Sequence, residues 1–350
     1  MAKRALITGI AGQDGAYLAK LLLEKGYQIF GIERMSPAAS CWRLEHLGIR
    51  DKVELVSVEL QDSKSLANAI ERCQPDEVYH LAAHSFVGAA FEDPVGFGEV
   101  NGLGVTRLLE AIRMVNPGIK FFQASTAELY GEGHSGPVTE EAPFKPANPY
   151  AVAKLYAYWM TRLYRQRYGM FACSGILFNH ESPLRSLDFV TRKITNAVAR
   201  IALNLDKVLK LGNLDARRDW GYAPDYVKAM WLMLQQEKPD DYIIATNETH
   251  TVGEFAQKAL EIVGLDWQAF VSSEKKLLRP GDINFLQGDY SKAKDKLGWQ
   301  PQVRFDQLVE IMVTEDLNRW QRWMKGERFP WDVPEHTVEG ETVSSIDKQS

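Results

Sequence analysis

Short apolar runs alternate with longer amphipathic segments through the first half of the chain, and this alternation is the feature that most constrains the fold. Segments such as YLAKLLLEKG and GVTRLLEAIRMV place apolar residues three and four positions apart, which is the period of a helix. Strands that alternate with helices and are apolar throughout indicate a parallel sheet covered on both faces. We therefore predict an α/β fold, a doubly wound parallel sheet of the Rossmann type. The predicted strands are residues 4–9, 27–33, 53–58, 77–83, 119–125 and 171–178.

The alternation weakens beyond about residue 179, where we expect a smaller, discontinuous C-terminal substrate domain. Further helices are predicted at FVTRKITNAVARIAL, DYVKAMWLMLQQ, 251–265 and 305–324, with short strands at VLKLGN and YIIATN. The helix and strand within 220–247 are expected to return to the main sheet. The predicted dinucleotide-binding domain is therefore 1–178 with 220–247, and the substrate domain is 179–219 with 248–330. Residues 336–350 are polar, lack aromatic side chains and are predicted to form a disordered tail.

Composition excludes several classes of function. The net charge is -5 and no run of basic residues occurs, so nothing favours binding to nucleic acid or to an anionic membrane. Cys41, Cys73 and Cys173 are far apart, which indicates neither a disulfide framework nor a metal site. The N-terminus lacks the pattern of a signal peptide, and no apolar run reaches the roughly 18 residues that span a bilayer. We expect a cytoplasmic protein with small-molecule partners.

Three glycines, Gly9, Gly12 and Gly15, directly follow the first predicted strand and open the next helix. Glycine is needed where a backbone turns tightly, approaches a pyrophosphate and packs a helix against a strand, and the helix N-terminus supplies amide donors. The spacing G-x-x-G-x-x-G in this position predicts a dinucleotide site. An ordinary connecting turn is the alternative.

The residues at the end of the second predicted strand do not decide between NAD and NADP. The second strand ends at Glu33, where an acidic residue would bind the ribose 2'-hydroxyl of NAD, and Arg34 follows, where an arginine would bind the 2'-phosphate of NADP. Asp62, past the third strand, would either accept from the adenine amino group or cap the helix that follows it.

A tyrosine and a lysine lie on one face of a predicted helix. Asn148 caps that helix, and Tyr150 and Lys154 follow four residues apart. An ammonium close to a phenol favours the phenolate, so we expect Lys154 to lower the pKa of Tyr150 towards neutrality. Tyr150 would then accept a proton from a sugar hydroxyl while a hydride leaves the same carbon. A solvated pair on a helix surface is the alternative.

The stretch QASTAELYG adds hydroxyls and a carboxylate at the end of the fifth strand. Thr126 is expected to hold the reacting sugar oxygen against Tyr150, with Ser125 as an alternative. Oxidation of an alcohol needs no further carboxylate. Glu128 instead suits removal of the acidic proton beside a new ketone, which an elimination requires. An exposed loop glutamate is the alternative.

Longer stretches closely resemble GDP-mannose 4,6-dehydratases, members of the extended short-chain dehydrogenase/reductase superfamily. They are TGIAGQDGAYL, LAAHSFVGAAFEDP, QASTAELYG, NPYAVAKLYAYW, GILFNHESPLRSLDFVTRKI and GNLDARRDWGYAPDYVKAMWLMLQQ. The resemblance implies a redox-neutral dehydration of GDP-mannose to GDP-4-keto-6-deoxy-mannose with NADP. Tyr150 would be the base, Lys154 would tune it, Thr126 would hold the hydroxyl, and Glu128 would take the C5 proton.

The resemblance also implies the binding residues and a homo-oligomer, either a dimer or a tetramer. The cofactor would be bound by Gly9, Gly12, Gln13, Asp14, Gly15, Arg34, Asp62, Leu81, Ala82, Ala83, Ser85, Tyr150, Lys154, His180 and Arg185. The substrate would be bound by Ser85, Asn179, Lys193, Arg218 and Arg279.

The chain departs from the family at two places. One is ERMSPAAS, where relatives have an arginine-rich segment that binds NADP and reaches a neighbouring subunit. The other is Glu59, where an aspartate is usual.

Two other functions are weighed against dehydration. A 4-epimerase or a 4-keto reductase of the same superfamily would share the glycine turn, Tyr150 and Lys154, but would not need Glu128 as a base. A non-catalytic NAD(P)-binding protein would be expected to have lost Tyr150 or Lys154, and this chain has both.

Overall fold

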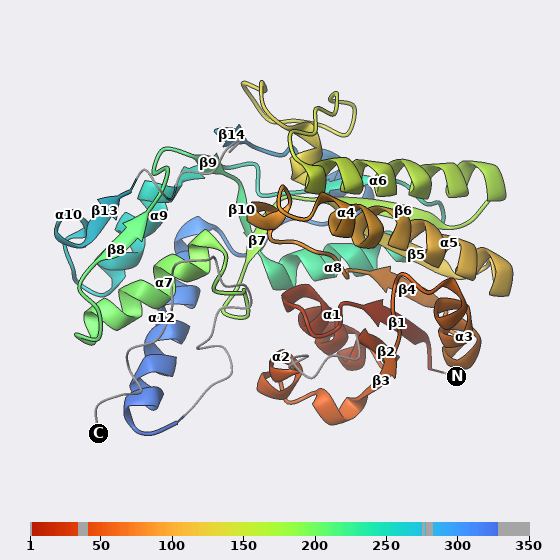
Figure 1. The fold of residues 1–350 in the computed structure, drawn as a ribbon, viewed down its shortest axis with the longest axis horizontal. Coiled ribbons are helices and arrows are strands. Elements are labelled where there is room, and N and C mark those ends of the chain that lie inside the picture. Colours follow the sequence, from red (N-terminus) through yellow and green to blue (C-terminus); the bar gives the residue numbers. More distant parts are fainter. Residues whose placement is uncertain (1, 34–40, 275–276, 278–282, 328–350) are drawn as a thin grey trace.

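Seven of the described strands form one parallel sheet in the order β11-β6-β5-β4-β1-β2-β3 (Figure 1). The structure, a computed structural model, describes residues 2–33, 41–274, 277 and 283–327. The predictions for Arg34, Arg279 and residues 336–350 lie outside these ranges. The sheet strands are β1 (Arg4–Thr8), β2 (Gln28–Glu33), β3 (Val53–Ser57), β4 (Glu77–His80), β5 (Lys120–Thr126), β6 (Ala172–Leu177) and β11 (Tyr242–Ile244).

The doubly wound parallel sheet predicted from the sequence is confirmed, and two strands end three residues earlier than predicted: β4, predicted over residues 77–83, and β11, predicted over YIIATN. Strand β4 ends at His80 because the next two backbone amides, of Leu81 and Ala82, each donate to the hydroxyl of Thr8 at 3.1 Å. The chain leaves the sheet there. After β3 the strand order reverses, since β4 pairs with the other edge of β1. In an open parallel sheet, ligands bind at the carboxyl ends of the strands beside such a reversal.

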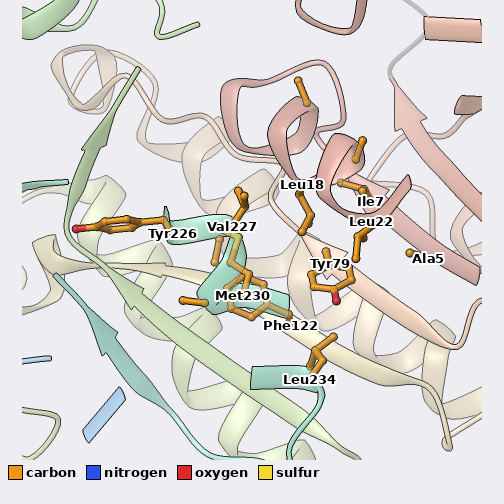
Figure 2. Packing of buried hydrophobic residues seen from close by; sticks show 14 of the residues in the cluster. Ala5, Ile7, Leu18, Leu22, Tyr79, Phe122, Tyr226, Val227, Met230 and Leu234 are labelled. Atoms are coloured by element: carbon orange, nitrogen blue, oxygen red, sulfur yellow. The ribbon is translucent and has the colours of Figure 1, made fainter. Parts of the chain in front are cut away.

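Helices α1 (Gln13–Glu24) and α8 (Ala223–Leu234) cover one face of the sheet. Alternate strand residues point to opposite faces, so Ile7 of β1 packs with Leu18 and Leu22 of α1 and with Met230 of α8 (Figure 2). Tyr79 and Phe122 extend this core across β4 and β5.

The opposite face is covered by α3 (Ser63–Cys73), α5 (Gly104–Val115) and α6 (Pro149–Tyr168). Leu6, the neighbour of Ile7 along β1, packs in a separate core with residues of these helices, including Leu66 of α3 and Leu108 of α5. Helix α6 carries both Tyr150 and Lys154 and begins near the carboxyl end of β5, so it brings them to the reversal point.

A second core lies to one side of the sheet, between α7 (Val190–Ala202), α9 (Val252–Ile262) and α12 (Phe305–Met324) (Figure 1). The chain returns to the main core twice after α7: α8 and β11 pack with the main sheet before the chain reaches α9, and Ala293, Leu297 and Trp299 belong to the main core before the chain enters α12. The other named helices and strands are α2 (Trp42–His46), α4 (Pro94–Phe97), α10 (Trp267–Phe270), α11 (Ser291–Leu297), β7 (Asn179–Glu181), β8 (Leu209–Leu211), β9 (Arg217–Arg218), β10 (Trp220–Tyr222), β12 (His250–Thr251), β13 (Val271–Ser273) and β14 (Phe285–Leu286). Across the described ranges, no helix is both long enough and apolar enough to cross a membrane.

Candidate active site

A cleft of about 1080 Å³ opens at the carboxyl ends of the central strands. It is lined by loops that follow β1, β4, β5 and β6 and by the first turns of α1 and α6. The structure therefore brings together most of the residues singled out from the sequence. Those that line the cleft are Gly9, Gly12, Gln13, Asp14, Gly15, Leu81, Ala82, Ala83, Ser85, Thr126, Glu128, Tyr150, Lys154, Asn179, His180 and Arg185.

The glycine turn has a shape that requires glycine. Gly9 has φ +71°, and a Cβ on it would lie 2.8 Å from the backbone nitrogen of Ala82. A Cβ on Gly15 would lie 2.7 Å from Cα of Ile10, so α1 could not pack this closely against β1. Gly12 is the N-cap of α1 and provides no side-chain bond to the first turn. Amide donors at a helix N-terminus beside a cleft fit the pyrophosphate of a dinucleotide.

Gln13 and Asp14, the first residues of α1, connect the glycine turn to β7. The amide of Gln13 donates to the backbone oxygen of His180 at 3.1 Å and accepts from Ser182 Oγ at 2.7 Å. An Asp14 carboxylate oxygen lies 2.8 Å from Nε2 of His180. Gln13, Asp14 and His180 thus hold two walls of the cleft together.

Arg185 places a positive charge near Tyr150. Its Nε lies 3.3 Å from a Glu181 carboxylate oxygen, and its guanidinium stacks on the ring of Phe189 at 3.6 Å from the centroid. Burial has the largest influence on the pKa of Tyr150 and raises it, whereas the charge of Arg185 acts in the opposite direction.

Tyr150, Lys154 and Thr126 form one buried group. The Thr126 side chain lowers the pKa of the Tyr150 phenol against the larger effect of burial, and the Lys154 ammonium lies 5.9 Å from the centre of the Tyr150 ring. Lys154 donates to the backbone oxygen of Ala124 in β5 at 3.0 Å. All three side chains are less than a tenth exposed. The arrangement suits proton transfer between a bound hydroxyl and Tyr150.

The prediction that Lys154 lowers the pKa of Tyr150 towards neutrality is wrong for the protein without a ligand. Burial raises the pKa of Tyr150 to about 12, and the negative charges of Glu128 and Asp14 oppose its ionisation further. Burial lowers the pKa of Lys154 itself to about 8. The sequence pattern placed the two groups correctly but contained no information about how far both are removed from water.

Glu128 is half-buried in the cleft wall and is held from two directions. It lies in the short helix η4 (Ala127–Tyr130), and its backbone nitrogen donates to the Thr126 hydroxyl at 3.3 Å. One of its carboxylate oxygens accepts from Nδ2 of Asn148 at 3.1 Å. Glu128 is therefore part of the same constellation as Tyr150. A carboxylate, a phenol and a hydroxyl around one cavity can serve both an oxidation and an elimination.

Of the predicted ligands that the structure describes, three do not line the cleft. Asp62 caps α3 by accepting from the backbone nitrogen of Lys64 at 3.0 Å, whereas Glu59 and Gln61 face the cleft. Lys193 and Arg218 lie just outside it. The backbone nitrogen of Lys193 donates to the backbone oxygen of Phe189, and Arg218 is the strand partner of Leu286; both of these neighbours line the cleft.

Sequence reasoning missed Arg43, a nearly buried arginine in α2 that also lines the cleft. Its guanidinium donates to the backbone oxygen of Leu184 at 2.7 Å and to that of Ala11 in the glycine turn at 3.1 Å. A single arginine in a short helix carries no signal of such long-range bonds. In the described ranges, no group of three or more His, Cys, Asp or Glu side chains is arranged to hold a metal ion.

Comparison with known proteins gives a consistent result. The sequence matches the family described as GDP-mannose 4,6 dehydratase over residues 6–312. It is 48% identical over 330 residues to GDP-mannose 4,6 dehydratase 1 of Arabidopsis thaliana, covering 91% of each chain. It is 46% identical over 339 residues to the GDP-mannose 4,6 dehydratase of Homo sapiens, covering 89% of this chain and 91% of the human one.

Solved structures show the same fold. The UDP-glucose 4-epimerase of Thermus thermophilus, in complex with NAD, has a TM-score of 0.78 and 28% identity, covering 89% of this chain and 98% of the epimerase. RMD from Pseudomonas aeruginosa, complexed with NADPH, has a TM-score of 0.76 and 23% identity, covering 91% of this chain and 100% of RMD.

Proposed function

This chain belongs to the GDP-mannose 4,6-dehydratase family, and on that basis we propose that it is a hydro-lyase that converts GDP-mannose to GDP-4-keto-6-deoxy-mannose. The observation that carries the proposal is the position of Glu128. It shares one cleft with Thr126, Tyr150, Lys154 and the glycine turn, and an alcohol oxidation alone would not require it.

The roles of the residues follow from the chemistry. The Tyr150 phenolate accepts the proton of the C4 hydroxyl, which the Thr126 hydroxyl holds in place. NADP, when bound, would supply a hydride acceptor for the oxidation at C4 and a hydride donor for the final reduction at C6. The new C4 ketone acidifies the C5 proton, and Glu128 removes it. This proton leaves with the C6 hydroxide as water. Reduction of the resulting 5,6-alkene at C6 adds a proton at C5, which balances the proton that Tyr150 took from the C4 hydroxyl and restores the phenolate.

We propose NADP as the cofactor, with NAD as the alternative. The fold itself does not distinguish them, since the Thermus epimerase binds NAD and the Pseudomonas protein binds NADPH. Glu33 lines the cleft at the end of β2, where an acidic residue suits NAD. Arg34, the proposed ligand of a 2'-phosphate, lies outside the described residues. Isothermal titration of the protein with each nucleotide measures the preference directly.

The substrate would lie across the opening between the two cores. We propose that Ser85 and Asn179, which line the cleft, contact the sugar nucleotide, and that Lys193, Arg218 and Arg279 bind its diphosphate and base. Asp62 stays a proposed adenine contact only if its side chain leaves the cap of α3. In this proposal residues 1–178 with 220–247 bind the cofactor, and 179–219 with 248–330 bind the substrate.

We further propose a cytoplasmic homo-oligomer built on the outer face of α6. An apolar groove of about 750 Å³ lies there, beside α4 and the helical segment Gly98–Leu103 that follows it. Exposed apolar side chains gather along it, with Val152 55%, Val95 75% and Phe91 60% exposed. Trp159 and Leu163, about half exposed, continue the apolar surface along α6. A second copy of the chain would bury this face.

The proposed reaction is tested by incubating the purified protein with GDP-mannose and NADP and following the sugar nucleotide by mass spectrometry. We expect loss of one water without net accumulation of NADPH. Glu128→Gln should lose dehydration, whereas Glu141→Gln, an exposed glutamate of a nearby loop, should retain it. A product of unchanged mass with altered sugar stereochemistry would point instead to an epimerase.

A further inference from the structure

The amide of Asn148 makes two hydrogen bonds that connect different parts of the site. Its Oδ1 accepts from the backbone nitrogen of Ala151 at 2.8 Å and so caps α6. Its Nδ2 donates to a Glu128 carboxylate oxygen at 3.1 Å. Because only the oxygen of an amide can accept from the helix backbone, the nitrogen must face the carboxylate. Asn148 is 7% exposed; its bond to Ala151 is buried, and its bond to the half-buried Glu128 is partly buried.

These bonds join the two elements that carry the reacting groups. Helix α6 holds Tyr150 in its first turn and Lys154 one turn later, whereas η4 holds Glu128. The backbone nitrogen of Glu128 is fixed separately, by its bond to the Thr126 hydroxyl at 3.3 Å. The contact with Asn148 acts on the carboxylate itself, and it therefore constrains the rotation of that carboxylate relative to Tyr150.

The Glu128 carboxylate explains why the cap of α6 is an asparagine rather than another capping residue. Asp, Ser and Thr cap helices as well as Asn does, and the helices α3, α9 and α10 are capped by Asp62, Thr251 and Asp266. Asp has no donor, and Ser and Thr must accept and donate through one hydroxyl oxygen on a shorter side chain, whereas Asn has a separate oxygen for the helix and a nitrogen for a neighbouring group. An aspartate at 148 would place a second carboxylate beside Glu128.

We propose that Asn148 is a positioning residue for the elimination step, which holds the carboxylate of Glu128 towards C5 while it caps the helix of Tyr150 and Lys154. This inference rests on the proposed dehydration. It assigns Asn148 no part in the oxidation at C4, because its bonds reach Tyr150 only through the helix backbone.

The test uses two variants that keep the cap: Asn148→Asp, which has no donor, and Asn148→Ser, which replaces the amide by a hydroxyl on a shorter side chain. Single-turnover reactions with GDP-mannose and bound NADP would follow cofactor reduction by absorbance and water loss by mass spectrometry. We expect both variants to keep the melting temperature and the rate of cofactor reduction. Water loss should slow by about 10- to 100-fold, so that reduced cofactor accumulates, because misplacing a reacting group by an ångström has effects of that size.

Asn148→Ala and Asp266→Ser are the controls. Asn148→Ala loses the cap and the donor, so both its melting temperature and its water loss should fall. Asp266→Ser changes the exposed cap of α10, distant in sequence from the cleft residues, and should leave both reactions unchanged.

Three outcomes would overturn the inference. Water loss at the unmutated rate in Asn148→Asp would show that the donor is dispensable. An equal decrease of cofactor reduction and water loss would show a general structural role. Absence of water loss from the unmutated protein would contradict the proposed dehydration itself. This outcome is distinct from the other two, because the unmutated protein is assayed before any variant.

Discussion

The Nε2 atom of His180 lies 2.8 Å from a carboxylate oxygen of Asp14, and this pair joins the first turn of α1 to β7. The imidazole also stacks on Tyr226, with 4.6 Å between the ring centroids. Burial lowers the pKa of His180, but the carboxylate of Asp14 outweighs burial and the pKa is raised above its usual value of 6.5. Burial raises the pKa of Asp14, and its pairing with His180 outweighs this and lowers it.

The stability of the fold should therefore depend on pH through this pair. A raised histidine pKa stabilises the folded state fully below about pH 6.5, and the contribution disappears as pH rises through the folded-state value. His180→Phe keeps a ring against Tyr226 and removes the pairing. We expect it to lower the free energy of unfolding by about 2 kcal/mol near pH 6 and by less near pH 9, measured by urea denaturation. An equal loss at both pH values would contradict the assignment.

The sequence predicted the sheet, the glycine turn and the four catalytic candidates because each depends on local spacing. Strands and helices follow from the period of apolar residues, and Tyr150 and Lys154 share a helix face by their separation alone. The links from Arg43 to Leu184 and from Asn148 to Glu128 were not predictable, because they join residues 141 and 20 positions apart, respectively. The raised pKa of Tyr150 could not be predicted from the sequence either, because it depends on burial by many residues that are distant along the chain.

Tyr150 should stay protonated at neutral pH until a ligand adds positive charge. Burial raises its pKa to about 12 in the protein alone. An ultraviolet difference titration of the unmutated protein against Tyr150→Phe should show no phenolate signal below about pH 10. Tyr168→Phe, which removes a half-exposed tyrosine near the end of α6, is the matched control. A Tyr150 midpoint near neutrality without nucleotide would mean that Lys154 alone suffices to activate it.

Lys154 should titrate far below a solvated lysine. Burial lowers its pKa from 10.5 to about 8, so the unfolded chain binds more protons than the folded one between these values. Stability should consequently rise with pH by about 3 kcal/mol over this window through Lys154 alone. Lys154→Met should remove that rise, as measured by chemical denaturation at a series of pH values. A parallel pH dependence in the variant and the unmutated protein would contradict the lowered pKa.

The apolar groove beside α6 should be buried in an assembly. Val152 lies in the groove on α6 and is 55% exposed in a single chain. Val152→Glu would place a charge into the proposed contact, and burying an unpaired charge is costly. We expect the unmutated protein to sediment as a dimer or tetramer and the variant as a smaller species. Met324→Glu, at the equally exposed end of α12, should not change the mass. A monomeric unmutated protein would exclude the proposed interface.

Gly15 should not tolerate a larger residue, because a side chain there would prevent α1 from packing against β1; its backbone conformation does not itself require glycine. A Cβ at this position would lie 2.7 Å from Cα of Ile10, and backbone atoms cannot move away as a side chain can. Gly15→Ala should therefore push α1 away from β1, lower the free energy of unfolding by about 1–3 kcal/mol and weaken nucleotide binding. Gly136→Ala is the control, because nothing lies within 4 Å of a Cβ there. Calorimetry measures both quantities. If Gly15→Ala bound NADP and melted like Gly136→Ala, the close approach of α1 to the strand would not be what the dinucleotide site requires.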